Sequence, residues 1–440
     1  MTTTSDLDFQ ALGDAMYRFA ERAYPLCRSI TGDGVRQTLE LVRETVPELA
    51  IHEVPSGEAI LDWTVPEEWN LRGARLIGPD GRVIVDSADH NLHVMGYSEP
   101  VDRRLSLDEL QGHLFSLPDQ PEAIPYRTSY WKRGWAFCLP HRVREALPPG
   151  EYRAVIDATL GPGSLTYGEV VLDGERGGGA DELVLISAHT CHPSLANDNL
   201  SGLGVVAQLA RHLADRKTRR FGYRLLFAPG TIGAITWLAR NKHDAARRVR
   251  HGLIAANLGD AGPFHFKRSE QGQSELDRSV EYVLRQRGVD HRVTDFEPFG
   301  YDERQYCSPG FDLPVGLLSR APWGSFPEYH TSGDNLSLIG AGPLARSLEL
   351  YVEIIDFLEA NRRYRNLAPH AEPQLGRRGL YHHIGGGEEG RARQLALLWV
   401  LNQSRGDRSL LDIAERSGLA FNSLAEAAAA LLAADLLEPA

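Results

Sequence analysis

Residues 183–188 carry the sequence feature that most restricts the fold. This run consists of apolar and small residues without polar alternation, which is typical of a strand buried on both faces. A stripe of apolar residues at helical spacing follows at 199–213. Further strand-like and helix-like segments alternate along the chain: strands at 223–228, 253–256 and 315–319, and helices at 232–241 and 343–360. This alternation predicts an α/β fold, with a mostly parallel sheet flanked by helices.

Two segments lack this regular alternation of strands and helices, which predicts that they form separate domains. Residues 61–164 hold short β-rich runs between turn signals, which indicates a β-rich domain inserted into the α/β domain. The α/β domain is therefore predicted to be discontinuous, over 1–60 and 165–365. Residues 366–440 read as a linker and a winged-helix-like domain of three short helices, with Gly418 at a turn.

The charge of the chain limits its partners. A net charge of −12 argues against broad binding to nucleic acid or to anionic membranes, because both require a basic surface. The last 35 residues contain only Arg408 and Arg416 as basic groups, so we expect the tail to pack or to bind a protein, including a second copy of this chain. The basic stretch 377–393 keeps DNA binding open as an alternative.

Features of export are not expected either. The first eight residues are polar, and no apolar run approaches the ~20 residues of a membrane helix. The four cysteines are scattered without CxxC spacing, which favours free thiols. The sequence thus predicts a cytoplasmic protein.

Candidate metal ligands follow two of the predicted strands. His189 and Asp198 lie between the strand at 183–188 and the next helix, and His330 follows the strand at 315–319. In an open α/β sheet this carboxyl edge is where ligands bind, and imidazole with carboxylate favours Zn²⁺. The structural alternative is that Asp198 binds no metal and only interacts with the positive end of the helix dipole. Asp334 is a candidate to orient His330.

The motifs around these residues resemble the di-zinc aminopeptidase fold shared by bacterial leucyl aminopeptidases and glutaminyl cyclases. The fuller resemblance is to a bacterial aminopeptidase-like family with an inserted β-rich domain and a C-terminal winged helix, often found in polysaccharide or natural-product gene neighbourhoods. It is carried by HTCHPSLANDNLSG (189–202) and DERQYCSPGFDLPVG (302–316), and by further motifs at 26–39, 91–101, 162–169 and 372–381.

The resemblance implies specific roles for these residues. His189, Asp198 and His330 match metal ligands, with Asp198 at the position that bridges two zinc ions, and Asp260 falls near a further carboxylate ligand. Classical di-zinc members also carry two adjacent glutamates after the strand at 223–228, the first a general base and the second a ligand, whereas the aminopeptidase-like family typically keeps Glu-Thr there. This chain has Gly230 and Thr231 there. One zinc ion is therefore expected rather than two, and the usual base is missing.

Other acids and bases near the motifs could replace that base. The candidates are Glu303, Glu328, His192 and Glu169, each with a structural role as its alternative. For Glu303 that alternative is a pair with Arg304.

Arg304 and Arg320 could instead bind a substrate carboxylate, because a guanidinium matches its geometry, although structural ion pairs are equally compatible with the sequence. We therefore predict a zinc-dependent, aminopeptidase-like amidohydrolase acting on a small amide, an amino-acid conjugate or a short peptide in a biosynthetic pathway. The competing interpretation is a non-hydrolytic descendant that binds metal and serves as a ligand-binding or scaffold protein.

Overall fold

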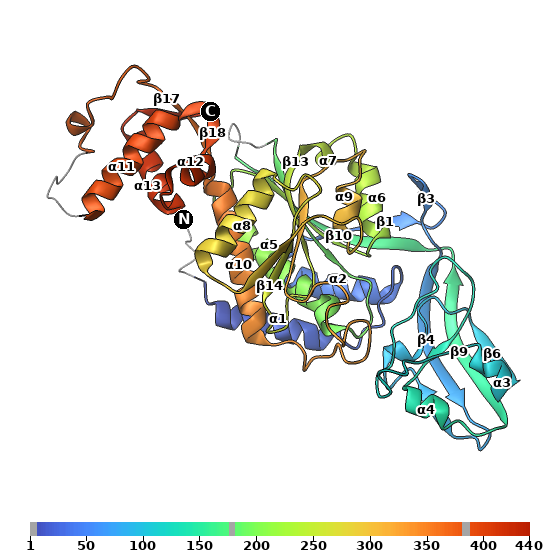
Figure 1. Cartoon of the computed structure of the whole chain (residues 1–440). Helices are drawn as coiled ribbons and strands as arrows, with labels where there is room; N and C mark the ends of the chain where they lie inside the picture. The colour runs from blue at the N-terminus through green and yellow to red at the C-terminus, as the bar shows by residue number, and fades with distance from the viewer. Residues whose placement is uncertain (1–6, 176–180, 381–387) are drawn as a thin grey trace. The chain divides into compact units, whose positions relative to one another are not determined.

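A mixed sheet forms the centre of the larger part of the molecule. In the computed structural model, which describes residues 7–175, 181–380 and 388–440, this sheet has eight strands in the order β1-β10-β12-β11-β13-β16-β14-β15 (Figure 1). Their bounds are β1 Ala50–Pro55, β10 Ser164–Leu172, β11 Leu183–His189, β12 Gly222–Ala228, β13 Val249–Ala255, β14 Phe264–Lys267, β15 His291–Thr294 and β16 Val315–Ser319. The four central strands β12, β11, β13 and β16 are parallel, whereas β10 and β14 run antiparallel to their neighbours in this group. The predicted α/β class is confirmed.

Helices cover both faces of this sheet (Figure 1). On one face α1 (Phe9–Ala23) and α2 (Asp33–Thr45) pack against α5 (Gly202–Asp215). On the other face α6 (Ile232–Asn241) packs against the short α9 (Glu303–Tyr306). Two further helices, α8 (Glu275–Arg287) and α10 (Ala341–Ala360), contact the sheet, and Tyr351 of α10 donates hydrogen bonds to carbonyls of β13 and β16. All seven residues of β11 are buried, as the apolar run predicts for a strand covered on both sides.

The chain between β1 and β10 forms a smaller sheet of its own. Its strands are antiparallel in the order β5-β4-β9-β6, with bounds β4 Glu68–Ile77, β5 Val83–Asp86, β6 Val101–Ser106 and β9 Glu151–Gly161. Shorter elements accompany it: β2 Ala59–Ile60, β3 Trp63–Thr64, α3 Leu107–Gln111, β7 Leu114–Phe115, β8 Phe137–Cys138 and α4 His141–Glu145. The boundaries predicted at 61 and 164 stay a prediction.

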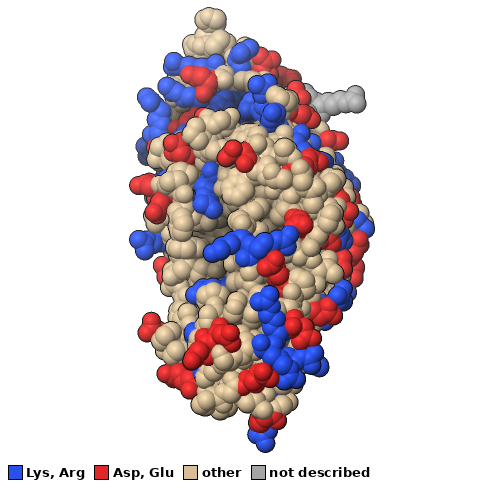
Figure 2. Space-filling view, turned by 90° about the vertical axis from the view of Figure 1, so that its right-hand side faces the viewer, with Lys and Arg blue, Asp and Glu red and all other residues tan. Residues whose placement is uncertain are grey.

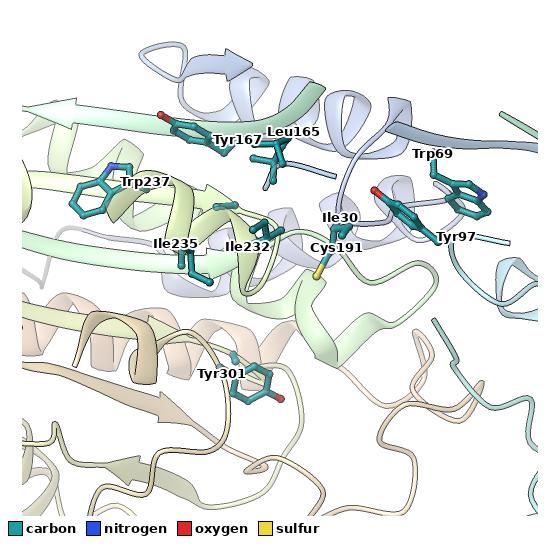
Figure 3. Close-up of a cluster of buried hydrophobic side chains, with 14 of the residues drawn as sticks. Ile30, Trp69, Tyr97, Leu165, Tyr167, Cys191, Ile232, Ile235, Trp237 and Tyr301 are labelled. Carbon is teal, nitrogen blue, oxygen red and sulfur yellow. The ribbon is translucent and has the colours of Figure 1, made fainter. Parts of the chain in front are cut away.

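The hydrophobic core runs without interruption from this smaller sheet into the large one. Trp69 and Tyr97 belong to the same buried cluster as Ile232 and Ile235 of α6 (Figure 3). Residues 1–352 accordingly form one compact unit. Exposed ion pairs such as Arg104–Glu151 (2.8 Å) and Arg153–Asp102 (2.7 Å) join β9 to the edge strand β6. Acidic and basic side chains are interspersed on the face shown in Figure 2.

Residues 353–440 form the second unit. It contains a three-stranded sheet in the order β18-β17-β19, with β17 Arg363–Asn366, β18 Arg405–Ser409 and β19 Leu437–Pro439. Three helices accompany this sheet: α11 Glu388–Gln403, α12 Leu410–Ser417 and α13 Phe421–Ala433. Gly418 ends α12 with φ 71°, a left-handed conformation that suits glycine, and so allows the turn into α13. None of the helices in the described ranges combines the length and apolar character that a membrane span requires.

Candidate metal centre

The candidate ligands are brought together by the parallel strands. In β11 and β12 the last residues, His189 and Ala228, are direct partners in register, so both strands end at the same edge of the sheet. The chain segments that leave this edge carry Asp198 after β11, Gly230 after β12 and His330 after β16. The sequence predicts that these distant segments lie close together, and they do so because parallel strands place their carboxyl ends side by side.

Three imidazoles converge on one buried carboxylate. His189 Nε2 lies 2.8 Å from Asp198 Oδ1, and His330 Nε2 lies 3.0 Å from Asp198 Oδ2. His192 Nδ1 lies 3.1 Å from His189 Nε2 and 3.6 Å from Asp198 Oδ2. We call these four residues the histidine–aspartate cluster. Asp198 and His189 are buried, whereas His330 remains partly exposed.

The donor atoms of His189, His192 and Asp198 fit a zinc ion. The ligand atoms of His189, His192 and Asp198 all lie within 4.8 Å of one another. Zinc–ligand bonds of about 2.0–2.2 Å in a tetrahedral site would put neighbouring ligand atoms roughly 3.3–3.5 Å apart, close to the separations found here. Neutral imidazole with carboxylate is a zinc-type donor set. His192, predicted as a catalytic candidate, thus lies among the atoms that could hold the metal.

The protonation of the cluster follows from burial and mutual charge. Burial lowers the pKa of His189 and of His330, which favours the neutral imidazoles that bind metals. Burial by itself would raise the pKa of Asp198, but His192 and His189 hold it well below the usual range. For His192, burial by itself lowers the pKa, yet Cys191 and Asp198 outweigh it and raise the pKa well above its usual value. A metal must therefore displace a proton from His192 in order to bind that imidazole.

The backbone around Asp198 is fixed by another carboxylate. The side chain of Asp334 accepts hydrogen bonds from the backbone N–H groups of Ala196 (3.0 Å), Asn197 (2.6 Å) and Asp198 (2.9 Å). Asp334 was expected to orient His330; it instead holds the segment that carries Asp198.

Asp260, predicted as a further ligand, also acts on this segment, because its Oδ2 accepts from Asn197 Nδ2 at 2.9 Å and its Oδ1 from Gly262 N at 2.7 Å. These bonds engage both carboxyl oxygens of Asp260, and its role as a ligand stays a prediction that rests on the resemblance.

Aromatic rings enclose the imidazoles. Tyr301 stacks on His189 with ring centroids 5.1 Å apart, and Tyr329 stacks on His330 at 4.0 Å. Tyr126, from the segment between β7 and β8, presents its edge to both His192 and His330. His330 has a φ of 54°, a conformation that is uncommon for residues other than glycine and is concentrated at functional sites. These ring contacts restrict the orientation of the imidazoles.

The position of the missing glutamate borders another acid, Asp302. A Cβ added at Gly230 would lie 3.2 Å from His189 Cβ and 3.3 and 3.7 Å from the two carboxyl oxygens of Asp302. Asp302 is buried, and its Oδ1 has no hydrogen-bond partner among the described residues. Burial, with the charge of Glu303, raises the pKa of Asp302 to about 7. A carboxyl group with a raised pKa therefore stands beside Gly230.

Two of the other predicted acids, Glu303 and Glu169, have structural partners. Glu303 is buried in an ion pair with Lys267 (2.5 Å) and not with Arg304. Glu169 accepts a hydrogen bond from Trp237 and pairs with Arg224 at 3.5 Å, which gives it a structural role. Glu328 sits in the loop before His330, where its backbone carbonyl accepts from Thr331 N. The contacts of Glu303 and Glu169 keep their carboxylates on partners outside the cluster, whereas this backbone contact does not place the carboxylate of Glu328, whose role stays a prediction.

The two predicted substrate-binding arginines differ from each other. Arg320 is buried; its guanidinium donates to Ser347 Oγ (2.9 Å) and the Gly262 carbonyl (2.6 Å) and lies over the ring of Phe264. These contacts occupy Arg320 structurally, so it is not placed to bind substrate. Arg304 instead lines a pocket together with Gly230.

Comparison with known proteins identifies the family. Residues 17–361 match the family described as a domain of unknown function, DUF4910, and residues 362–439 match a winged helix-turn-helix family. The chain belongs to the DUF4910 family. A Clostridium acetobutylicum protein, provisionally named as a polysaccharide biosynthesis protein with an aminopeptidase-like domain, is 46% identical over 426 residues, 97% of this chain and 96% of the relative.

Solved structures support the fold. A C. acetobutylicum crystal structure, provisionally called a peptidase, has a TM-score of 0.90 at 44% identity and covers 98% of both chains. A zinc aminopeptidase of Bacillus subtilis has a TM-score of 0.58 at 14% identity, over 79% of this chain and 94% of its own. The second likeness concerns the fold alone. The predicted aminopeptidase-like fold with a C-terminal winged helix is thus confirmed for this DUF4910 protein.

Sequence reasoning missed two features of this DUF4910 site. The placement of His192 among the ligand atoms was signalled by the His-x-x-His spacing of 189–192. Asp302 was signalled only by its position next to Glu303, and the two neighbouring carboxylates go to different places: Asp302 toward Gly230, and Glu303 toward Lys267. The sequence shows that two acids are adjacent, but which of them faces the site depends on the local backbone of α9.

Proposed function

We propose that this chain is a zinc-dependent amidohydrolase that cleaves a small amide, an amino-acid conjugate or a short peptide. The histidine–aspartate cluster carries the proposal, because three imidazole nitrogens meet one buried carboxylate at the carboxyl edge of the sheet. His189, His192, Asp198 and His330 would hold the ion. When bound, Zn²⁺ supplies a Lewis acid that polarises an amide carbonyl and activates water.

Asp302 is the acid–base group in this proposal. In a glutamate the carboxyl oxygens lie roughly 3–4 Å from Cβ, given bond lengths of about 1.5 Å. The oxygens of Asp302 lie 3.3 and 3.7 Å from the Cβ position of residue 230, so they fall in the same range of distance that a glutamate at 230 would reach. The carboxylate of Asp302, at the N-terminal end of α9, thus substitutes for the missing glutamate carboxylate after β12. Asp302 Oδ1 takes a proton from the attacking water and gives it to the leaving amine.

The C. acetobutylicum relative is named for polysaccharide biosynthesis, and we propose the same setting, in the cytoplasm, for the present chain. Gly230 supports a second candidate, a metal-binding protein that has lost hydrolysis. The two differ in what Asp302 does: only the hydrolase needs its carboxylate for turnover.

Metal analysis of the purified full-length chain tests the proposal. We expect about one zinc ion per chain, and at least tenfold weaker zinc binding in His189→Ala and in His330→Ala. His243→Ala, an exposed histidine after α6, is the matched control and should bind zinc normally. Undiminished zinc in both cluster variants would refute the site.

Turnover is then measured with zinc-loaded protein on a panel of aminoacyl 4-nitroanilides and aminoacyl amides. Hydrolysis that disappears with a chelator and returns with zinc supports the amidohydrolase. Stoichiometric zinc without hydrolysis of any panel member supports the non-hydrolytic candidate.

A further inference from the structure

A pocket opens on the side of Gly230 that faces the inserted β-rich segment. It has a volume of about 220 Å³ and is lined by residues from distant parts of the chain, including Trp63 of β3, Trp131, Gly230, Ile235 of α6 and Arg304 of α9. Gly230 lies between this pocket and the cluster, since a Cβ added to it would be 3.2 Å from His189 Cβ. A molecule in this pocket would therefore be one residue away from the candidate metal ligands.

Two tryptophans at the pocket are unusually exposed. Trp63 is 43% exposed and Trp131 is 55% exposed, although tryptophan is highly buried on average. Their rings lie 5.1 Å apart and are inclined by 54°, so they present flat apolar surfaces at one place. They come from separate segments, the β2–β3 hairpin and the loop between β7 and β8. Exposed aromatic surface next to a pocket indicates a ligand that covers it.

Arg304 adds a positive charge to the same pocket. Its Nε is buried and has no hydrogen-bond partner among the described residues, a state that costs free energy unless a ligand satisfies it. Of the two acids that precede it in the chain, Glu303 pairs with Lys267 and Asp302 is directed toward Gly230. A guanidinium binds a carboxylate through two parallel hydrogen bonds, which would satisfy the buried Nε.

We propose that this pocket, which we call the Arg304 pocket, binds a ring-bearing carboxylate: the ring lies on Trp63 and Trp131, and the carboxylate pairs with Arg304. The volume is below the range of about 300–1,000 Å³ of pockets for drug-sized ligands, so it suits a single substituted ring. This inference rests on the proposed function in one respect: the ring of the bound carboxylate belongs to the substrate and lies next to the amide bond that is cleaved. An aromatic acid and a sugar acid share the required chemistry.

Binding of two acids to the full-length chain tests the proposal, with affinity measured by ligand-observed NMR titration. The probes are benzoate and glucuronate, and the neutral molecules benzamide and glucose serve as their controls. We expect at least one acid to bind, about tenfold or more tightly than its neutral control. Preference for benzoate or for glucuronate identifies the ring as aromatic or as a sugar.

Variants assign the binding to the pocket. Arg304→Gln should weaken the binding acid about tenfold or more, Arg304→Lys less, and Trp131→Ala by at least several-fold. Arg103→Gln, at an exposed position of β6, is the control that should not change affinity. Trp131 is largely exposed, so its variant keeps the test valid if Arg304→Gln does not fold.

Three results would overturn the proposal: neither acid binds, the neutral molecules bind equally well, or Arg304→Gln and Trp131→Ala bind the acid as the unaltered chain does. His189→Ala separates this proposal from the function above. That variant should lose zinc yet keep the affinity for the acid, because the Arg304 pocket does not include the cluster. Normal zinc binding with no acid binding would leave the metal centre intact and refute the pocket alone.

Discussion

Replacing Asp334 by asparagine tests whether the metal centre depends on the backbone that carries Asp198. Both carboxyl oxygens of Asp334 accept backbone N–H groups, two on Oδ1 and one, from Asp198, on Oδ2. In either protonation state a carboxyl group can accept all three. Asparagine keeps one oxygen and turns an NH₂ group toward one side, so at least one buried N–H loses its acceptor and faces another donor.

The magnitude follows from that loss. A buried donor left unsatisfied costs about 1–3 kcal/mol, and the remaining bonds weaken when the acceptor is neutral. We therefore expect Asp334→Asn to destabilise the ordered 196–198 segment by about 2–3 kcal/mol. Because zinc binds the ordered segment, the Kd should rise by about 30- to 140-fold, at 1.4 kcal/mol per factor of ten.

Competition with a chromophoric chelator measures this Kd at fixed pH. Asp14→Asn, at an exposed position of α1, is the matched control and should bind zinc like the unaltered chain. A Kd for Asp334→Asn within threefold of the unaltered chain would refute the reasoning, because Asp198 would then hold its position without the full set of three bonds.

Three further predictions concern single carboxylates. Asp302→Asn should keep zinc but lower kcat about 10²- to 10⁴-fold on whichever panel substrate is cleaved, because the proton acceptor is lost; turnover near that of the unaltered chain would exclude Asp302 as the base. Asp260→Asn should change zinc stoichiometry little, since Asp260 bonds to Asn197 and Gly262, and loss of zinc on metal analysis would instead support Asp260 as a ligand. The ion pair with Arg36 lowers the pKa of Glu68 to about 2, so its stabilisation is present above pH ~4.5 and is lost as the pH falls toward 2. Glu68→Gln should therefore lower the urea-unfolding free energy by about 1 kcal/mol at pH 7, a figure reduced for partial exposure, and by less at pH 3; an equal difference at both pH values would contradict this.

The main-chain elements that the sequence predicts well are those with strong periodicity. The helix at 232–241 and the strand at 315–319 agree with α6 and β16. Strands β14 and β15 were missed because they are only four residues long and contain polar residues, so they resemble loops. They join the sheet because β14 pairs with β16, a contact between distant segments that local pattern does not reveal.

The sequence likewise predicts some residues of the candidate site well and others poorly. His189, Asp198 and His330 were identifiable because each follows a predicted strand of one sheet and lies in a recognisable motif. The role of Arg320 was misjudged, since residue type alone cannot show that Ser347 and a backbone carbonyl occupy its guanidinium. The same limit applies to Asp334, whose three acceptor bonds depend on how the loop after Thr331 meets the segment at 196–198.

The sequence by itself determined the α/β class, the edge of the sheet where ligands meet, and the absence of the glutamate at 230. These depend on residue type and on periodicity, which are local properties. Only the tertiary structure decided that Asp302 stands beside Gly230 and that Trp63, Trp131 and Arg304 share a pocket. Such relations depend on how segments far apart in the sequence pack together, and packing is set by the whole core rather than by any one segment.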